Sequence, residues 1–144
     1  METTRTRPSP YQNNKKLLHS FGLFADFIQV QAAEDDTRMY MSVVTVGELR
    51  RGVESIRHRG DAGQAGQLEK WLEALLAEYQ DHILGIDTDI AQLWGLLRAP
   101  HPENALDKQI AATALIHELT VVTRNDKDFL GTGVPVLNPF KGKT

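Results

Sequence analysis

The 144-residue chain contains no cysteine, which excludes disulfide bonds and zinc sites built from thiolates. No apolar run approaches the roughly 20 residues that cross a membrane. The first residues also lack the apolar core of a secretory signal. We therefore expect a cytoplasmic protein with no membrane segment. The net charge of -3 argues against a strongly basic coat for nucleic acid, but it leaves open a local basic patch or binding through metal ions.

The length fits one domain with a real core, and the composition is that of an ordinary globular chain. Residues 1–16 are polar, contain two prolines and show no apolar period, so we expect a disordered or irregular arm there. Residues 17–144 are then expected to form the single domain. Its first predicted element is a helix over residues 17–33, which carries Asp26.

After this helix the pattern alternates between strands and helices. Strands are predicted at residues 39–46, 82–86, 119–123 and 134–137, and helices at residues 47–60, 64–79, 89–98 and 105–117. Such alternation indicates an α/β fold with a mostly parallel sheet covered by helices on both faces. In such a sheet the carboxyl ends of the strands share one edge with the beginnings of the helices that follow them, and this edge is where α/β proteins bind ligands.

Four acidic residues are expected to meet along this edge. Glu48 lies just after a predicted strand and in the first turn of the helix that follows it, and Asp107 lies in the first turn of another helix. Asp126 and Asp128 follow the strand of residues 119–123. Crowded carboxylates repel each other unless protonation or a divalent cation relieves the repulsion. An all-oxygen site of this kind suits Mg²⁺ or Mn²⁺. The five histidines are scattered and none pairs at zinc-ligand spacing.

Helix capping is the alternative explanation for two of these acids. The spacing of Thr45 and Glu48 fits a capping box, and Asn104 and Asp107 have the same spacing. A second alternative concerns the basic residues around Arg50, which either follow a phosphate backbone or form an ordinary solvated helix face. The residues alone leave both alternatives open.

Three stretches, "MYMSVVTVGELRRGVE", "ALDKQIAATALIHELTVVTRNDKDF" and "GTGVPVLNPF", together resemble PIN-domain ribonuclease toxins of the VapC and FitB type. The similarity covers roughly residues 25–140. It implies a PIN-like three-layer α/β/α sandwich and a Mg²⁺- or Mn²⁺-dependent endoribonuclease activity. It also implies a cognate antitoxin that inhibits the enzyme, as in type II toxin–antitoxin systems.

The resemblance also implies roles for individual residues. The family's catalytic and metal-binding acids correspond to Glu48, Asp107 and Asp128, with Asp126 as a lower-ranked metal ligand. Thr123 and Asn125 correspond to polar residues that support the site or the substrate, and we predict a similar role for Arg50. The family opens with a short strand and a "D-T-N" element that supplies its first metal-binding Asp, and we expect this strand and this Asp to be missing from the chain.

Two functional hypotheses follow. The first is a toxin endoribonuclease that cleaves phosphodiester bonds in single-stranded or looped RNA. The second is a catalytically impaired PIN-like module that retains antitoxin binding or dimerisation. Both predict a homodimer with an antitoxin groove. Asp26 is the nearest acid that could replace the missing ligand, although its position indicates a place on the first helix.

Overall fold

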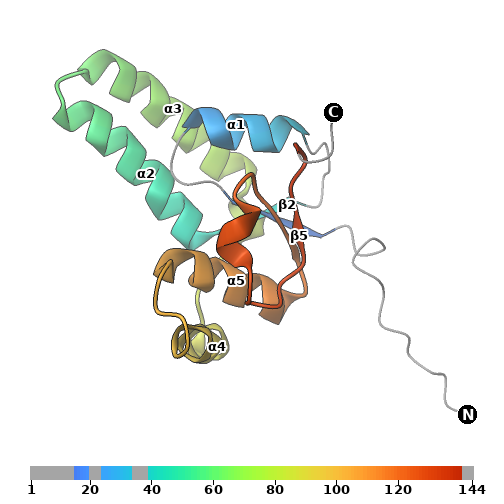
Figure 1. The fold of residues 1–144 in the computed structure, drawn as a ribbon. Helices are drawn as coiled ribbons and strands as arrows, with labels where there is room; N and C mark the ends of the chain where they lie inside the picture. Colours follow the sequence, from blue (N-terminus) through green and yellow to red (C-terminus); the bar gives the residue numbers. More distant parts are fainter. Residues whose placement is uncertain (1–14, 20–23, 34–38, 141–144) are drawn as a thin grey trace, which may run out of the picture.

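A computed structural model describes residues 15–19, 24–33 and 39–140 (Figure 1). Its centre is a five-stranded sheet with the order β3-β2-β1-β4-β5. All four neighbouring pairs are parallel. The strands are β1 (Lys16–Leu18), β2 (Met39–Ser42), β3 (Ile83–Leu84), β4 (Thr120–Val122) and β5 (Val136–Leu137). The predicted parallel α/β architecture is therefore confirmed.

Helices cover both faces of this sheet. They are α1 (Phe24–Ala33), α2 (Val43–His58), α3 (Ala62–Glu78), α4 (Thr88–Arg98) and α5 (Ala105–His117), with short 3-10 turns η1 (Gln80–His82) and η2 (Asp126–Phe129). Figure 1 shows α1, α2 and α3 grouped on one side and α4 and α5 on the other. This arrangement is the expected three-layer sandwich. Among the described residues, no helix is long and apolar enough to cross a membrane.

The two faces of the sheet bury two separate apolar clusters. Successive residues of a strand point to opposite faces, so Leu17 packs in the cluster that contains Ile110 of α5, whereas Leu18 packs in the cluster that contains Phe27 of α1. Val121 and Val122 of β4 divide in the same way. Two short strands in the middle of the sheet thus hold both helical layers.

The strand that we expected to be missing is present as β1, and it lies at the centre of the sheet between β2 and β4. The expected helix over residues 17–33 begins only at Phe24. With two apolar residues, β1 is too short for a recognisable alternating pattern, and its extended conformation comes from pairing on both sides. Residues 1–14 of the expected arm lie outside the described residues, and the assignment of residues 17–144 to one domain stays a prediction.

The prediction of a strand over residues 39–46 is correct only for its first half. The strand β2 ends at Ser42, and α2 already begins at Val43. The hydroxyl of Ser42 accepts the backbone N–H of Val44 and caps the helix. The β-branched run suggested a strand, but the cap and the packing of α2 on the sheet override that local preference. As a result Glu48 lies in the second turn of α2, one turn further from the cap than the sequence indicated.

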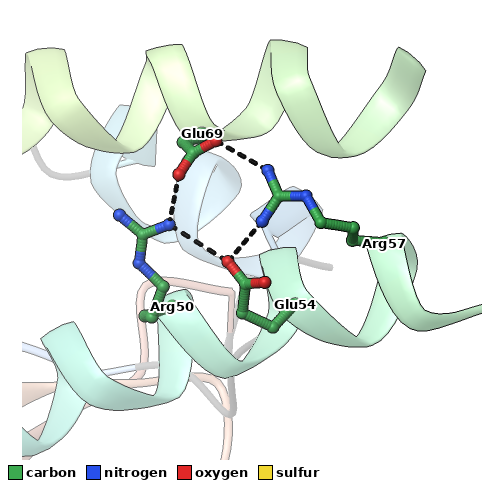
Figure 2. Close-up of polar contacts among 4 residues, drawn as sticks. All are labelled: Arg50, Glu54, Arg57 and Glu69. Carbon is green, nitrogen blue, oxygen red and sulfur yellow. Dashed lines mark hydrogen bonds and ion pairs between the residues drawn. The ribbon is translucent and has the colours of Figure 1, made fainter. Parts of the chain in front are cut away.

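An ion-pair network joins α2 to α3 (Figure 2). Glu69 of α3 accepts hydrogen bonds from Arg50 at 2.8 Å and from Arg57 at 2.6 Å, and both arginines also contact Glu54. These hydrogen bonds lower the pKa of the Glu69 carboxyl below its usual value. The side chains are one third to one half exposed, so solvent and salt screen the network.

We predict that Leu17→Ala destabilises the fold by about 2–5 kcal/mol, because it leaves a cavity in the middle of the sheet. Leu130→Ala is a matched control, since Leu130 is 78% exposed whereas Leu17 is fully buried. Urea unfolding of both variants measures the difference. An equally small change in the free energy of unfolding in Leu17→Ala and Leu130→Ala would contradict the central position of β1.

We predict that Glu69→Gln lowers the melting temperature modestly at neutral pH and low salt. The pKa of Glu69 is lowered in the folded state, so its stabilising effect is present above the pKa of the unfolded chain and is lost below about pH 4. The difference from wild type should therefore shrink at acidic pH and in 1 M salt. Glu73→Gln, an exposed change on the same helix, controls for the altered charge; equal pH dependence of the two variants would refute the network's contribution.

Candidate metal site at the carboxyl edge of the sheet

Asp107 is the buried carboxylate of this edge, with only 3% of the residue exposed. It lies in the first turn of α5, which two contacts hold in place. The indole Nε1 of Trp94 donates to the carbonyl of Ala105 at 2.9 Å, and the ammonium of Lys108 donates to the carbonyl of Glu103. The beginning of α5 is therefore anchored to α4 and to the preceding loop, and Asp107 has a defined position.

Capping does not explain why Glu48 and Asp107 are acidic. The N-cap of α2 is Ser42, and the hydroxyl of Thr45 has no hydrogen-bond partner among the described residues. The N-cap of α5 is Asn104, which has a left-handed backbone with φ 55° and makes no side-chain capping bond. The capping explanation is thus wrong for Glu48 and for Asp107, and the two carboxylates need another explanation.

His19 is a site residue that the sequence reasoning missed. It follows β1 directly, and its backbone N–H donates to the carbonyl of Val122 at 3.0 Å, which extends the pairing with β4. Its ring is 2% exposed, meets the ring of Phe129 edge-on, and places Nδ1 3.0 Å from the hydroxyl of Thr123. The sequence signal that could have revealed His19 was its position directly after the apolar pair Leu17–Leu18.

His19 and Asp107 face each other inside the molecule. The ring nitrogen Nε2 lies 3.2 Å from Oδ1 of Asp107. This distance alone would allow a hydrogen bond, yet Oδ1 has no hydrogen-bond partner among the described residues, so the two groups lack the required alignment. We therefore treat the pair as a close contact between a ring nitrogen and a carboxylate, not as a hydrogen bond. A buried carboxylate oxygen left in this way is costly unless a cation meets it.

Glu48 borders the same cavity as this pair. The cavity measures about 240 Å³ and is lined by His19, Val44, Glu48, Asn104, Ala105, Leu106, Asp107 and Ile110. The Glu48 side chain is about one fifth exposed and lies 3.5 Å from Nη1 of Arg51. The structure therefore brings Glu48 and Asp107 to one cavity, as the sequence predicted, and adds His19 to them.

The acids of η2 do not line this cavity. Asp126 and Asp128 are half-buried, and Oδ1 of Asp126 accepts a hydrogen bond from Nδ2 of Asn138 at 3.3 Å. The backbone N–H of Asn125 donates to the hydroxyl of Thr123, the group that also contacts His19. Thr123 therefore lies beside His19, while its supporting role and the ligand roles of Asp126 and Asp128 stay predictions.

Two further candidates are engaged elsewhere. Arg50 takes part in the network between α2 and α3 (Figure 2), so its predicted role in substrate binding stays a prediction. Asp26 lies on α1, as expected, and accepts a hydrogen bond from Nε of Arg124 at 2.9 Å. Its contact with Arg124 gives Asp26 a local partner, and Asp26 does not line the cavity of Asp107.

The donor groups fit a divalent ion that keeps several water ligands. No group of three acidic or histidine side chains gathers around one point within the part of the chain that the structure describes. His19 and Asp107 do lie together, and Glu48 borders their cavity. Ions such as Mg²⁺ are commonly held through only one or two carboxylates, with water and substrate phosphates completing the coordination. The unpaired oxygen of Asp107 is the observation that supports this fit.

Comparisons with known proteins agree with this architecture. The PIN domain family matches residues 23–134. Toxin FitB of Neisseria gonorrhoeae is 34% identical over 71% of this chain and 76% of its own length, and VapC ribonuclease Y4jK of Sinorhizobium fredii is 29% identical over 72% and 76%. The crystal structure of FitAcB from Neisseria gonorrhoeae superimposes with a TM-score of 0.72 at 28% identity, covering 88% of this chain and 99% of that one. The chain therefore belongs to the PIN-domain family, in the group that includes the FitB and VapC toxins.

Proposed function

We propose that the protein is a metal-dependent endoribonuclease and the toxin component of a type II toxin–antitoxin system. The observation that carries this proposal is the buried carboxylate of Asp107, which borders a cavity at the carboxyl edge of the sheet. Its Oδ1 has no hydrogen-bond partner within the described part of the chain. Its similarity to a VapC ribonuclease supports the same reaction class.

Glu48, Asp107 and Asp128 are the acids that we assign to holding Mg²⁺ or Mn²⁺, with Asp126 as a further candidate. A divalent ion supplies a Lewis acid that activates water and neutralises charge on a phosphodiester. Asp107 is fixed by the anchored first turn of α5. Thr123 contacts the ring of His19 and the backbone of Asn125, so it positions both residues at the edge of the site.

The proposed substrate is single-stranded or looped RNA. Its unstacked bases and accessible phosphates can approach an open edge of a sheet, whereas the major groove of an RNA duplex is deep and narrow. The cavity of Glu48 and Asp107 lies at such an edge, between the beginnings of α2 and α5. A metal-bridged contact to phosphate is also compatible with the net charge of -3.

The proposed protein partners are a cognate antitoxin and a second copy of the chain. Solved toxin–antitoxin complexes are among the structures that this fold matches. Leu106, which lines the cavity, is 46% exposed, and Val43, the chain neighbour of the lining residue Val44, is 40% exposed. An amphipathic antitoxin helix could cover such residues and bring a basic side chain to the carboxylates.

A catalytically impaired PIN-like module is the second candidate. The observation that favours it is that no three acidic or histidine side chains gather around one point in the described residues. A site of this kind would hold metal weakly, while the surface around it would still bind an antitoxin. The two candidates differ in RNA cleavage and not in fold.

We predict that the purified protein cleaves a mixed RNA pool in Mg²⁺ or Mn²⁺, and that a chelator stops the cleavage. Asp107→Asn should reduce the rate at least about a hundredfold, because it removes a charged ligand. Asp89→Asn is the control, since Asp89 is an exposed acid in the first turn of α4 and does not line the cavity. Circular dichroism establishes that each variant is folded.

Gel electrophoresis of the RNA separates the outcomes. Chelator-sensitive cleavage that is lost in Asp107→Asn and kept in Asp89→Asn supports the endoribonuclease. Folded wild-type protein that leaves the RNA intact in both metals would contradict it and favour the impaired module. Cleavage that survives both the chelator and Asp107→Asn would contradict the metal-dependent mechanism.

A further inference from the structure

We propose that His19 is a metal ligand that stands in place of the first acidic ligand of the family, and that its nitrogen shifts the preference of the site from Mg²⁺ toward Mn²⁺. This inference deepens the proposed function, because it concerns the same site. It does not depend on RNA cleavage, since metal binding can be measured without RNA.

The position of His19 is the first argument. β1 is the central strand, and His19 is the first residue beyond its carboxyl end. The resemblance places a metal-binding Asp after the family's first strand, and the structure shows that this chain has a strand there after all. The side chain at that place is an imidazole, buried in the cavity that Asp107 and Glu48 border.

The distance between His19 and Asp107 is the second argument. Two neighbouring ligands at right angles, each about 2.1 Å from one ion, lie about 3.0 Å apart. Nε2 of His19 and Oδ1 of Asp107 are 3.2 Å apart. Two ligands of one ion direct their lone pairs at the ion and not at each other, so the missing hydrogen-bond alignment at Oδ1 is the geometry expected of them.

The other ring nitrogen supplies the third argument. Metal-binding histidines usually donate their second N–H to a nearby oxygen, which fixes the ring and leaves the first nitrogen free to bind. Nδ1 of His19 lies 3.0 Å from the hydroxyl oxygen of Thr123, an atom with two lone pairs that also accepts the N–H of Asn125. If Nδ1 donates to Thr123, Nε2 presents its lone pair toward Asp107.

A purely structural histidine is the competing explanation. A buried histidine that only neutralises an aspartate is expected to align its N–H with the carboxylate, because an unsatisfied buried oxygen is costly. The contact between His19 and Asp107 is close but not aligned. The structural explanation thus leaves Oδ1 unsatisfied, whereas a bound cation satisfies both groups.

The chemistry of the donors sets the ion preference. Mg²⁺ favours oxygen ligands, while imidazole nitrogen favours first-row transition metals. His19→Asp should restore an all-oxygen donor set. We therefore expect the ratio of Mn²⁺ affinity to Mg²⁺ affinity to fall about tenfold in this variant.

The test uses chelator-treated full-length protein without RNA. Isothermal titration calorimetry with Mg²⁺ and with Mn²⁺ gives the affinity ratio, and pulsed electron paramagnetic resonance of bound Mn²⁺ detects coupling to a ¹⁴N nucleus. The variants are His19→Asp, His19→Gln and the control His58→Asp, which changes an exposed histidine at the end of α2. His19→Gln removes the imidazole without adding charge, so it keeps the test valid if His19→Asp does not fold.

The expected result is ¹⁴N coupling in wild type and in His58→Asp that disappears in both His19 variants, with the tenfold fall in the affinity ratio in His19→Asp. Mn²⁺ bound without nitrogen coupling, an unchanged ratio, or no binding of either ion by wild type would overturn the inference. Nitrogen coupling without RNA cleavage would support the inference and contradict the proposed function. RNA cleavage without nitrogen coupling would contradict the inference about His19 and support the proposed function.

Discussion

The pairing of β1 with a strand on each side is the constraint on which the rest of the structure depends. This three-residue strand lies between β2 and β4, and its two leucines point into the two apolar clusters. The pairing continues to His19, whose backbone bonds to Val122. The same hydrogen bonds that complete the sheet therefore carry a side chain into the cavity of Asp107.

The side chains at the cavity are held in fixed positions, yet one buried carboxylate oxygen among them is unsatisfied. The first turn of α5 is anchored by Trp94 and Lys108, while Thr123 holds the ring of His19. Within this support, Oδ1 of Asp107 has no hydrogen-bond partner in residues 15–19, 24–33 and 39–140. Such a group lowers stability when no cation is bound, and proteins keep costly groups of this kind mainly where function needs them. Metal binding would then stabilise the folded protein and complete the site in one step.

Much of the fold could be predicted because its helices are long and regularly patterned. The predicted helix over residues 105–117 agrees with α5 at both ends, and α3 differs from its prediction by only a few residues. The failures came where tertiary contacts override local preference. Two leucines are too few to reveal β1, and the β-branched residues after Ser42 favour a strand although they begin α2.

The candidate site was predictable only in part, for a related reason. The edge of a parallel sheet collects residues from several strand ends, so Glu48 and Asp107 could be placed together from topology. His19 could not, because its position depends on a strand that the sequence did not reveal. Local histidine spacing also gives no sign of this position, since the neighbours of His19, Asp107 and Thr123, are about ninety and one hundred residues away in the chain.

The central claim is that His19 and Asp107 together hold a divalent ion at the carboxyl edge of the sheet. The most direct measurement is a crystal structure of the protein with Mn²⁺, using anomalous scattering to locate the ion. We expect an anomalous peak within coordination distance of both Nε2 of His19 and Oδ1 of Asp107, about 2.0–2.3 Å from each. An ion bound only to carboxylates, with His19 turned away from it, would contradict the account.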